Sequence, residues 1–144
     1  MDTNKTYINK HKKDISWYLI DAKEQTLGRI STNIANILRG KNEPHYSSNT
    51  NHKNYIVIVN SKKVHVTGKK NYQKLYRRHS GKPGSMKIET FNELQKRIPN
   101  RIIEKAIKGM LPKNRLGREL FTQIKIYEEE KHPHNAQKPQ KIKL

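Results

Sequence analysis

The fold is decided by residues 16–40, which read SWYLIDAKEQTLGRISTNIANILRG. Ser16 to Asp21 is rich in aromatic and branched residues and predicts a short strand. From Thr26 onward apolar residues recur at helical spacing, and Gly40 follows the last of them, so we expect a helix that ends before Gly40. This stretch therefore supplies a strand followed by an amphipathic helix.

The next apolar stretch, Tyr55 to Val59, lacks polar alternation and predicts a strand that is covered on both faces. A strand, a helix and a buried strand form a βαβ unit, whose strands are parallel and whose crossover is right-handed. Val64 and Val66 suggest a further short strand, and the sequence leaves its pairing open. The pattern predicts an α/β protein.

The second half of the chain contains two helix signals. Thr90 and Glu93 have the spacing of a capping box, which predicts a helix start at Thr90. A second helix is expected after Pro99, with one apolar face and one basic face. The apolar face comprises Ile102, Ile103, Ala106, Ile107, Met110 and Leu111, and the basic face comprises Arg101, Lys105 and Lys108.

The end of the chain completes the expected division into an extension, a domain and a tail. We expect the stretch from Leu120 to Tyr127 to end in a final strand, and the chain beyond Glu128 is polar and contains proline. We expect a flexible basic extension over residues 1–15, a single α/β domain over 16–127 and an extended tail over 128–144.

The charge balance points to a polyanionic partner. The 144 residues include 31 Lys and Arg against 12 Asp and Glu, a formal net charge of +19. Ser61 to Ile88 contains nine basic residues and no acidic one, and Lys105 to Arg118 is also free of acids. Such runs are often solvated surface, but here tyrosines and glycines are interleaved, which favours contact with RNA phosphates and bases.

Signatures of catalysis are missing. The chain has no cysteine, which excludes disulfides, cysteine-based metal sites and thiol catalysis. Neither glycine-rich phosphate loop, GxGxxG or GxxxxGK[ST], occurs, and the seven histidines have no metal-ligand spacing. We therefore expect no cofactor and no metal. Two alternatives stay open: a small α/β enzyme acting on RNA or a nucleotide, and a basic protein that binds DNA or anionic membranes through the helix at 100–111.

Seven motifs in order identify a family resemblance. They are WYLIDA at 17–22, TLGRI at 26–30, RGK at 39–41, VTGKK at 66–70, YRRHSGKPG at 76–84, KGMLPKNRLGREL at 108–120 and HPHNAQKP at 132–139. Together they resemble the family of the thirteenth protein of the bacterial-type large ribosomal subunit, over about residues 17–139.

This resemblance implies a three-layer α/β/α domain around a small, mostly parallel sheet, with a basic loop and extended tails. It implies binding to large-subunit rRNA, early action in subunit assembly, neighbouring ribosomal proteins as partners, and no catalysis, membrane contact or small-molecule substrate. The expected RNA contacts are basic, aromatic or histidine residues of the basic run, the turn after the second helix and the tail: Lys69, Lys70, Lys74, Tyr76, Arg77, Arg78, His79, Lys82, Lys113, Arg115, Arg118, His132 and His134.

The chain departs from the family pattern at two places. Lys53-Asn54 stands where relatives often have Gly-Asp, which puts any role of that acid in doubt. Ser85 stands where a second glycine usually follows Pro-Gly, and a positive φ there would be unfavourable for serine.

Residue usage bears on the source of the chain. It favours Lys over Arg and is rich in Ile and Asn, a bias of AT-rich genomes. Together with the missing transit-peptide pattern, this predicts a plastid-encoded protein of the chloroplast ribosome; a bacterial cytoplasm is the alternative.

Overall fold

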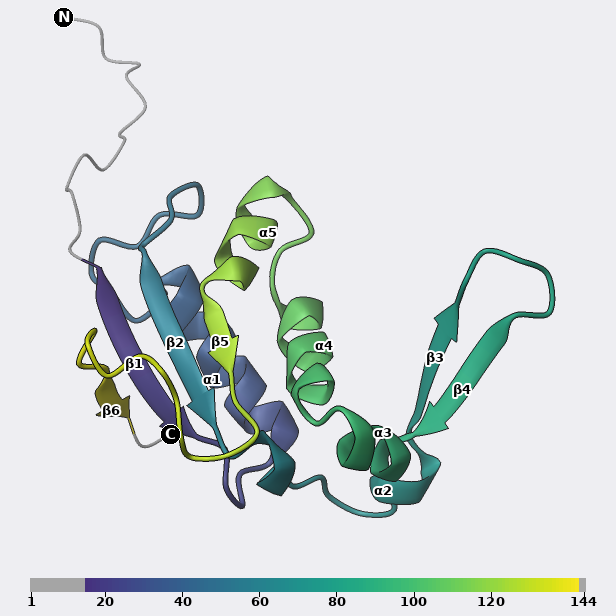
Figure 1. Ribbon diagram of the computed structural model, residues 1–144. Helices are drawn as coiled ribbons and strands as arrows, with labels where there is room; N and C mark the ends of the chain where they lie inside the picture. Colours follow the sequence, from purple (N-terminus) through teal and green to yellow (C-terminus); the bar gives the residue numbers. More distant parts are fainter. Residues whose placement is uncertain (1–14, 143–144) are drawn as a thin grey trace, which may run out of the picture.

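A parallel four-stranded sheet forms one end of the molecule, and a hairpin over residues 75–90 lies at the other end (Figure 1). The computed structural model describes residues 15–142. The strands are β1 (Ser16–Asp21), β2 (Asn54–Val59), β5 (Ile124–Ile126) and β6 (Gln140–Ile142), in the order β5-β2-β1-β6. All three strand pairs are parallel, which confirms the α/β class. The N-terminal extension expected over 1–15 lies, except for Ile15, outside the described residues.

The crossover from β1 to β2 is made by α1 (Leu27–Arg39), as the sequence predicts. Its apolar positions are buried, with Ile30, Ile34 and Leu38 almost fully inaccessible. Gly40 ends the helix at a φ of 70°, and its N–H donates to the carbonyl of Ile37 at 3.0 Å. This left-handed cap is a position at which glycine has no Cβ penalty.

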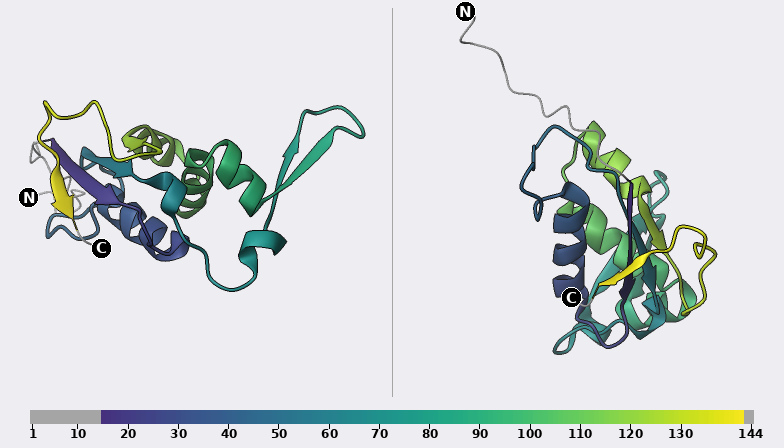
Figure 2. Two further views of the ribbon diagram at one scale, coloured as in Figure 1. Left: turned by 60° about the horizontal axis from the view of Figure 1, so that its bottom comes forward. Right: turned by 90° about the vertical axis from the view of Figure 1, so that its left-hand side faces the viewer.

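A second helix, α4 (Asn100–Met110), packs beside α1 on the same face of the sheet (Figure 2). Ile102, Ile103 and Ile107 are fully buried, so the predicted apolar face is largely confirmed. Met110 is the exception: it is 40% exposed, because α4 ends there and the chain turns away. After the turn, α5 (Arg115–Thr122) leads into β5.

The opposite face of the sheet is crossed by residues 127–139 (Figure 2). This segment consists of turns, so the third layer of the sandwich is irregular chain and not a helix. It ends in β6, which pairs with β1. The stretch from Leu120 to Tyr127 does end in a strand, β5, after the last residues of α5. The expectation that this strand is the final one is wrong, because β6 follows it. Strand β6 was not predicted because its three residues, Gln140–Ile142, include only one branched side chain.

The short strand predicted around Val64 and Val66 is also wrong. Asn60 turns the chain with a φ of 60°, a 3₁₀ turn follows over Ser61–Lys63, and His65 forms only an isolated bridge with Thr26. Val64 and Val66 are buried against the core, so their alternation reflects packing of a loop.

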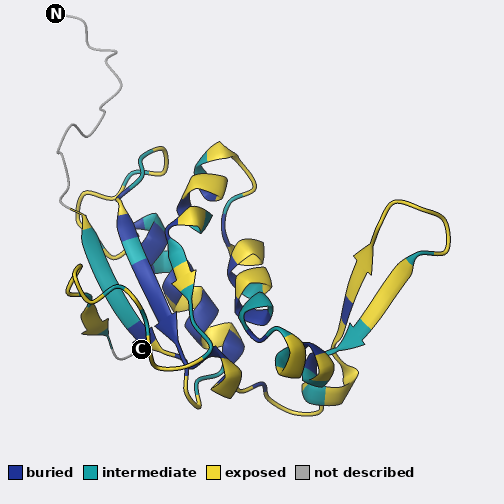
Figure 3. Cartoon of the chain, viewed as in Figure 1, coloured by how far each residue is buried: buried dark blue, intermediate teal, exposed yellow. Residues whose placement is uncertain are grey.

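The basic run forms ordered structure where a loop was expected. It contains α2 (Lys70–Gln73), β3 (Leu75–His79) and β4 (Met86–Thr90), and the two strands form an antiparallel hairpin that leads into α3 (Phe91–Arg97). The capping box is confirmed, because Thr90 and Glu93 exchange both hydrogen bonds. Figure 3 shows that the hairpin is exposed along most of its length. Its few alternating apolar residues, such as Met86 and Ile88, lie among many charged ones and are exposed, so the pattern did not predict strands.

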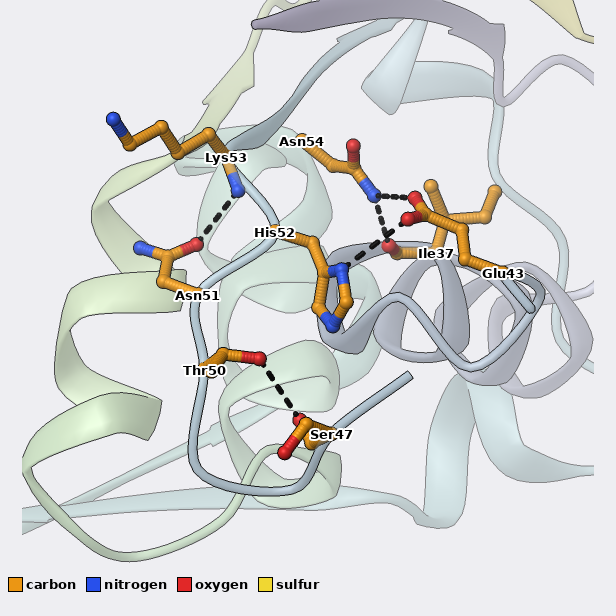
Figure 4. A network of polar contacts seen from close by, with 8 residues as sticks. All are labelled: Ile37, Glu43, Ser47, Thr50, Asn51, His52, Lys53 and Asn54. Atoms are coloured by element: carbon orange, nitrogen blue, oxygen red, sulfur yellow. Dashed lines mark hydrogen bonds and ion pairs between the residues drawn. The ribbon is translucent and has the colours of Figure 1, made fainter. Parts of the chain in front are cut away.

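The structure shows the backbone and contacts at the two places where the chain departs from the family pattern, Lys53-Asn54 and Ser85. Asn54 donates from its side-chain amide to the carbonyl of Ile37 at 2.8 Å and to Glu43 at 3.0 Å (Figure 4). An aspartate cannot donate these bonds, so asparagine replaces it with a different contact. Lys53 adopts a φ of 53°, a conformation that favours glycine. Ser85 lies outside the left-handed region, so the expected cost does not arise there.

Candidate nucleic-acid interface

The hairpin carries basic side chains on two faces. The register pairs Arg77 with Ile88 and Arg78 with Lys87, and successive residues of a strand point to opposite faces. The outer face holds Arg77 and His79 among exposed apolar side chains, namely Leu75, Met86 and Ile88. The inner face holds Arg78, and a turn with Lys82 joins the strands. All of these predicted contacts except Tyr76 are exposed, and so are Lys69, Lys70 and Lys74.

Tyr76 has a structural position that the prediction did not anticipate. It is 9% exposed, and its ring centre lies 6.5 Å from that of Phe91. The ammonium groups of Lys105 and Lys74 lie 5.0 Å and 5.5 Å from the ring centre. Burial raises the pKa of the Tyr76 hydroxyl. Because the ring is covered, it is not free to stack on a base, and we correct the prediction for Tyr76 in this respect.

A second group of cations lies where the hairpin meets the helices. We call it the hairpin–helix seam; it surrounds Glu89 and comprises Arg78 and Lys87 of the hairpin, Arg97 of α3, and Arg101 and Lys105 of α4. Nη2 of Arg97 donates to both carboxylate oxygens of Glu89 at 2.7 Å. These bonds, with the charges of Arg78 and Arg101, hold the pKa of Glu89 below its ordinary value.

The site prediction did not include Lys87, Arg97, Arg101 or Lys105. The basic face of the second helix was the available signal, because it places Arg101 and Lys105 one turn apart. Nothing local to the sequence shows that Arg78 and Lys87 approach them.

The turn between α4 and α5 positions three predicted contacts, Lys113, Arg115 and Arg118, all exposed. The side chain of Asn114 caps α5 by accepting from the N–H of Gly117 at 2.8 Å. A Cβ on Gly117 would lie 1.8 Å from the carbonyl oxygen of Pro112, so the turn requires glycine. The basic side chains therefore project from a closely packed turn.

The two tail histidines lie apart from these groups. His134 packs against Trp17, with ring centres 5.3 Å apart, and its Nε2 lies 2.7 Å from the Tyr127 hydroxyl. Burial, and secondarily the charges of His132 and Lys125, lower the pKa of His134. Both histidines belong to the segment that crosses the sheet face opposite α1, whereas the hairpin extends from the far end of the helix layer (Figures 1 and 2).

Within residues 15–142, none of the helices is long and apolar enough to cross a membrane. The same residues contain no group of three or more His, Asp or Glu side chains placed to hold a metal ion.

The fold and its surface define a class: an α/β protein that carries exposed cations on a hairpin and a helical turn, as proteins that bind polyanions do. The chain belongs to the family described as Ribosomal protein L13, whose sequence model matches residues 15–133.

Similar proteins cover most of the chain. A protein named large ribosomal subunit protein uL13 from Prochlorococcus marinus is 59% identical over 128 residues, which are 89% of this chain and 85% of that protein. The corresponding protein of Crocosphaera subtropica is 60% identical, over 91% and 87% of the two chains. A protein named uL13c from Porphyra purpurea is 58% identical, over 95% of this chain and 96% of its own.

Proposed function

We propose that this chain is a structural constituent of the large ribosomal subunit, that it binds large-subunit rRNA and supports early assembly, and that it acts in translation. The observation that carries the proposal is its membership of the ribosomal protein family over residues 15–133. Relatives named as large-subunit proteins match it over most of its length. The excess of exposed cations provides the physical means, because each phosphate neutralised by Lys or Arg releases counterions.

The α/β domain acts as a rigid platform, and the hairpin, the α4–α5 turn and the segment over 128–139 that crosses the sheet face contact separate RNA segments. Their separation on the surface supports this division, because one short RNA element does not reach all three. The proposed contacts are the exposed or half-exposed members of the predicted set: Lys69, Lys70, Lys74, Arg77, Arg78, His79, Lys82, Lys113, Arg115, Arg118, His132 and His134.

The role we propose is architectural and not enzymatic. Its partners are large-subunit rRNA and the ribosomal proteins beside it in the subunit. We place the protein in the ribosomes of a plastid, because relatives named uL13c match nearly the whole chain and the residue usage is that of an AT-rich genome. A bacterial cytoplasm is the other compartment that the cyanobacterial relatives support.

A binding competition tests the RNA specificity. The purified full chain is mixed with labelled, transcribed large-subunit rRNA from Prochlorococcus marinus, and binding is measured on filters against an excess of unlabelled duplex DNA. We expect retained binding, because specific contacts add to the electrostatic attraction that DNA shares. Complete displacement of the rRNA by this excess of DNA would contradict the proposal and favour a nonspecific polyanion-binding protein.

A further inference from the structure

We propose that the hairpin–helix seam holds a single backbone phosphate of the RNA, in a position that links the hairpin to α4. This inference rests on the proposed function and adds a defined site to it. The seam draws its cations from three parts of the fold: Arg78 and Lys87 from the hairpin, Arg97 from α3, and Arg101 and Lys105 from α4.

The charge of the seam is unbalanced. Five cations surround Glu89, and only Arg97 forms an ion pair with it. Within residues 15–142, Arg78, Lys87, Arg101 and Lys105 have no carboxylate within 4.0 Å. Mutual repulsion of four such cations is relieved by an anion placed between them, and the attraction is stronger near the low-dielectric protein surface than in water.

The seam is also held in shape before any ligand arrives. Tyr76 anchors β3 in the core beside Phe91, and the ammonium of Lys105 lies over its ring. The capping box fixes the junction of β4 and α3, and the bonds to Glu89 fix the guanidinium of Arg97. Cations that are already in position lose less conformational freedom on binding than free surface lysines do.

The hollow is too small to take up a ligand, so an anion can bind only at its mouth. It encloses about 10 Å³, which is room for about one water molecule and too little for a base or a nucleotide. A phosphodiester fits, because it can approach from outside with its two unesterified oxygens turned to the guanidinium groups of Arg78 and Arg101. The connected RNA chain stays on the surface, where the neighbouring exposed lysines of the hairpin lie.

Phosphorothioate protection tests the site. The full chain is bound to phosphorothioate-substituted, transcribed large-subunit rRNA from Prochlorococcus marinus, and iodine cleavage reports which phosphates are covered. Two charge-removing variants are compared with the unmodified chain: Arg101→Gln with Lys105→Gln on α4, and Arg78→Gln with Lys87→Gln on the hairpin. We expect both double variants to leave the same phosphate open to iodine cleavage. The other phosphates that the unmodified chain covers should stay protected.

The salt dependence of binding gives a second readout. Each pair should reduce the slope of log K against log salt by roughly 0.9, the value for one phosphate in duplex geometry. The exchanged variant Arg101→Lys with Lys105→Arg keeps both charges and should retain the protection.

A matched control removes the same charge elsewhere. Lys23→Gln with Lys41→Gln changes two exposed lysines in turns beside α1 and should leave the seam phosphate protected. Thermal melting of every variant confirms that it folds.

Three results overturn the proposal. If both seam variants protect the same phosphates as the unmodified chain, the seam does not bind a phosphate, although the proposed rRNA binding stands. If the two variants lose protection of two different, non-adjacent phosphates, the hairpin and α4 make independent contacts and share no site. An unmodified chain that protects no phosphate contradicts the proposed function together with the seam.

Discussion

Replacing Gly117 by alanine places a methyl group against the backbone at the turn between α4 and α5. The new Cβ would lie 1.8 Å from the carbonyl oxygen of Pro112 and 2.8 Å from its carbonyl carbon. Real Cβ atoms stay at least 3.0 Å from such neighbours, so the two backbone segments must separate by at least 1.2 Å. That shift strains the hydrogen bond between Asn114 and the N–H of Gly117, and it disturbs the packing of buried Leu120.

We expect Gly117→Ala to lower the free energy of unfolding by about 3 kcal/mol, at the upper end of the cost of overpacking, because the clash is with backbone. For a chain of this size, the melting temperature should then fall by roughly 6–12 °C. The assay is urea and thermal unfolding followed by circular dichroism. Gly109→Ala is the matched control: it lies in α4 with nothing within 4 Å of its Cβ position, and alanine there should stabilise the helix by up to about 1 kcal/mol.

The contrast between these two alanines is the test. If Gly117→Ala unfolds at the same urea concentration as the unmodified chain, the turn does not hold the close approach to Pro112, and our description of how Lys113, Arg115 and Arg118 are positioned is wrong.

Three further outcomes are expected. Arg77→Ala with Arg78→Ala should reduce the salt slope of rRNA binding by roughly 0.9 for each phosphate that the two arginines neutralise, and an unchanged slope would show that neither arginine binds a phosphate. Ile107→Ala should cost about 2–5 kcal/mol in urea unfolding, because Ile107 is fully buried; a negligible loss would contradict its core position. Because burial lowers the pKa of His134, the unfolded chain binds more protons near pH 6, so the stabilising contribution of neutral His134 is present above about pH 6.5 and is lost as the pH falls below it. His134→Gln should flatten this pH dependence, measured as urea midpoints at pH 7.5 and 5.5, and an equally steep profile would refute the assignment.

The parts of the fold predicted from sequence are those whose signals are local. The strand from Ser16, the helix that ends at Gly40 and the capping box at Thr90 all depend on residues within one or two turns of each other. The parts that were missed depend on distant pairing. Strand β6 exists because Gln140–Ile142 meets the free edge of β1, more than 100 residues earlier in the chain.

The site shows the same limit. Exposed arginines and lysines of the basic run were predicted, because charge without nearby acids is visible in the sequence. The burial of Tyr76 was not predicted because it depends on Phe91 and Lys105, which lie on other elements. The seam was missed for the same reason: Arg78 and Arg101 line one hollow only because α3 packs against both the hairpin and α4.

Association with ribosomes tests the central claim most directly. A tagged copy of the chain is sedimented from lysate of the source cells through a sucrose gradient, and the heaviest fractions are washed with high salt. We expect the chain to stay with large subunits and intact ribosomes after the wash. Recovery of the chain only at the top of the gradient would contradict a structural role in the large ribosomal subunit.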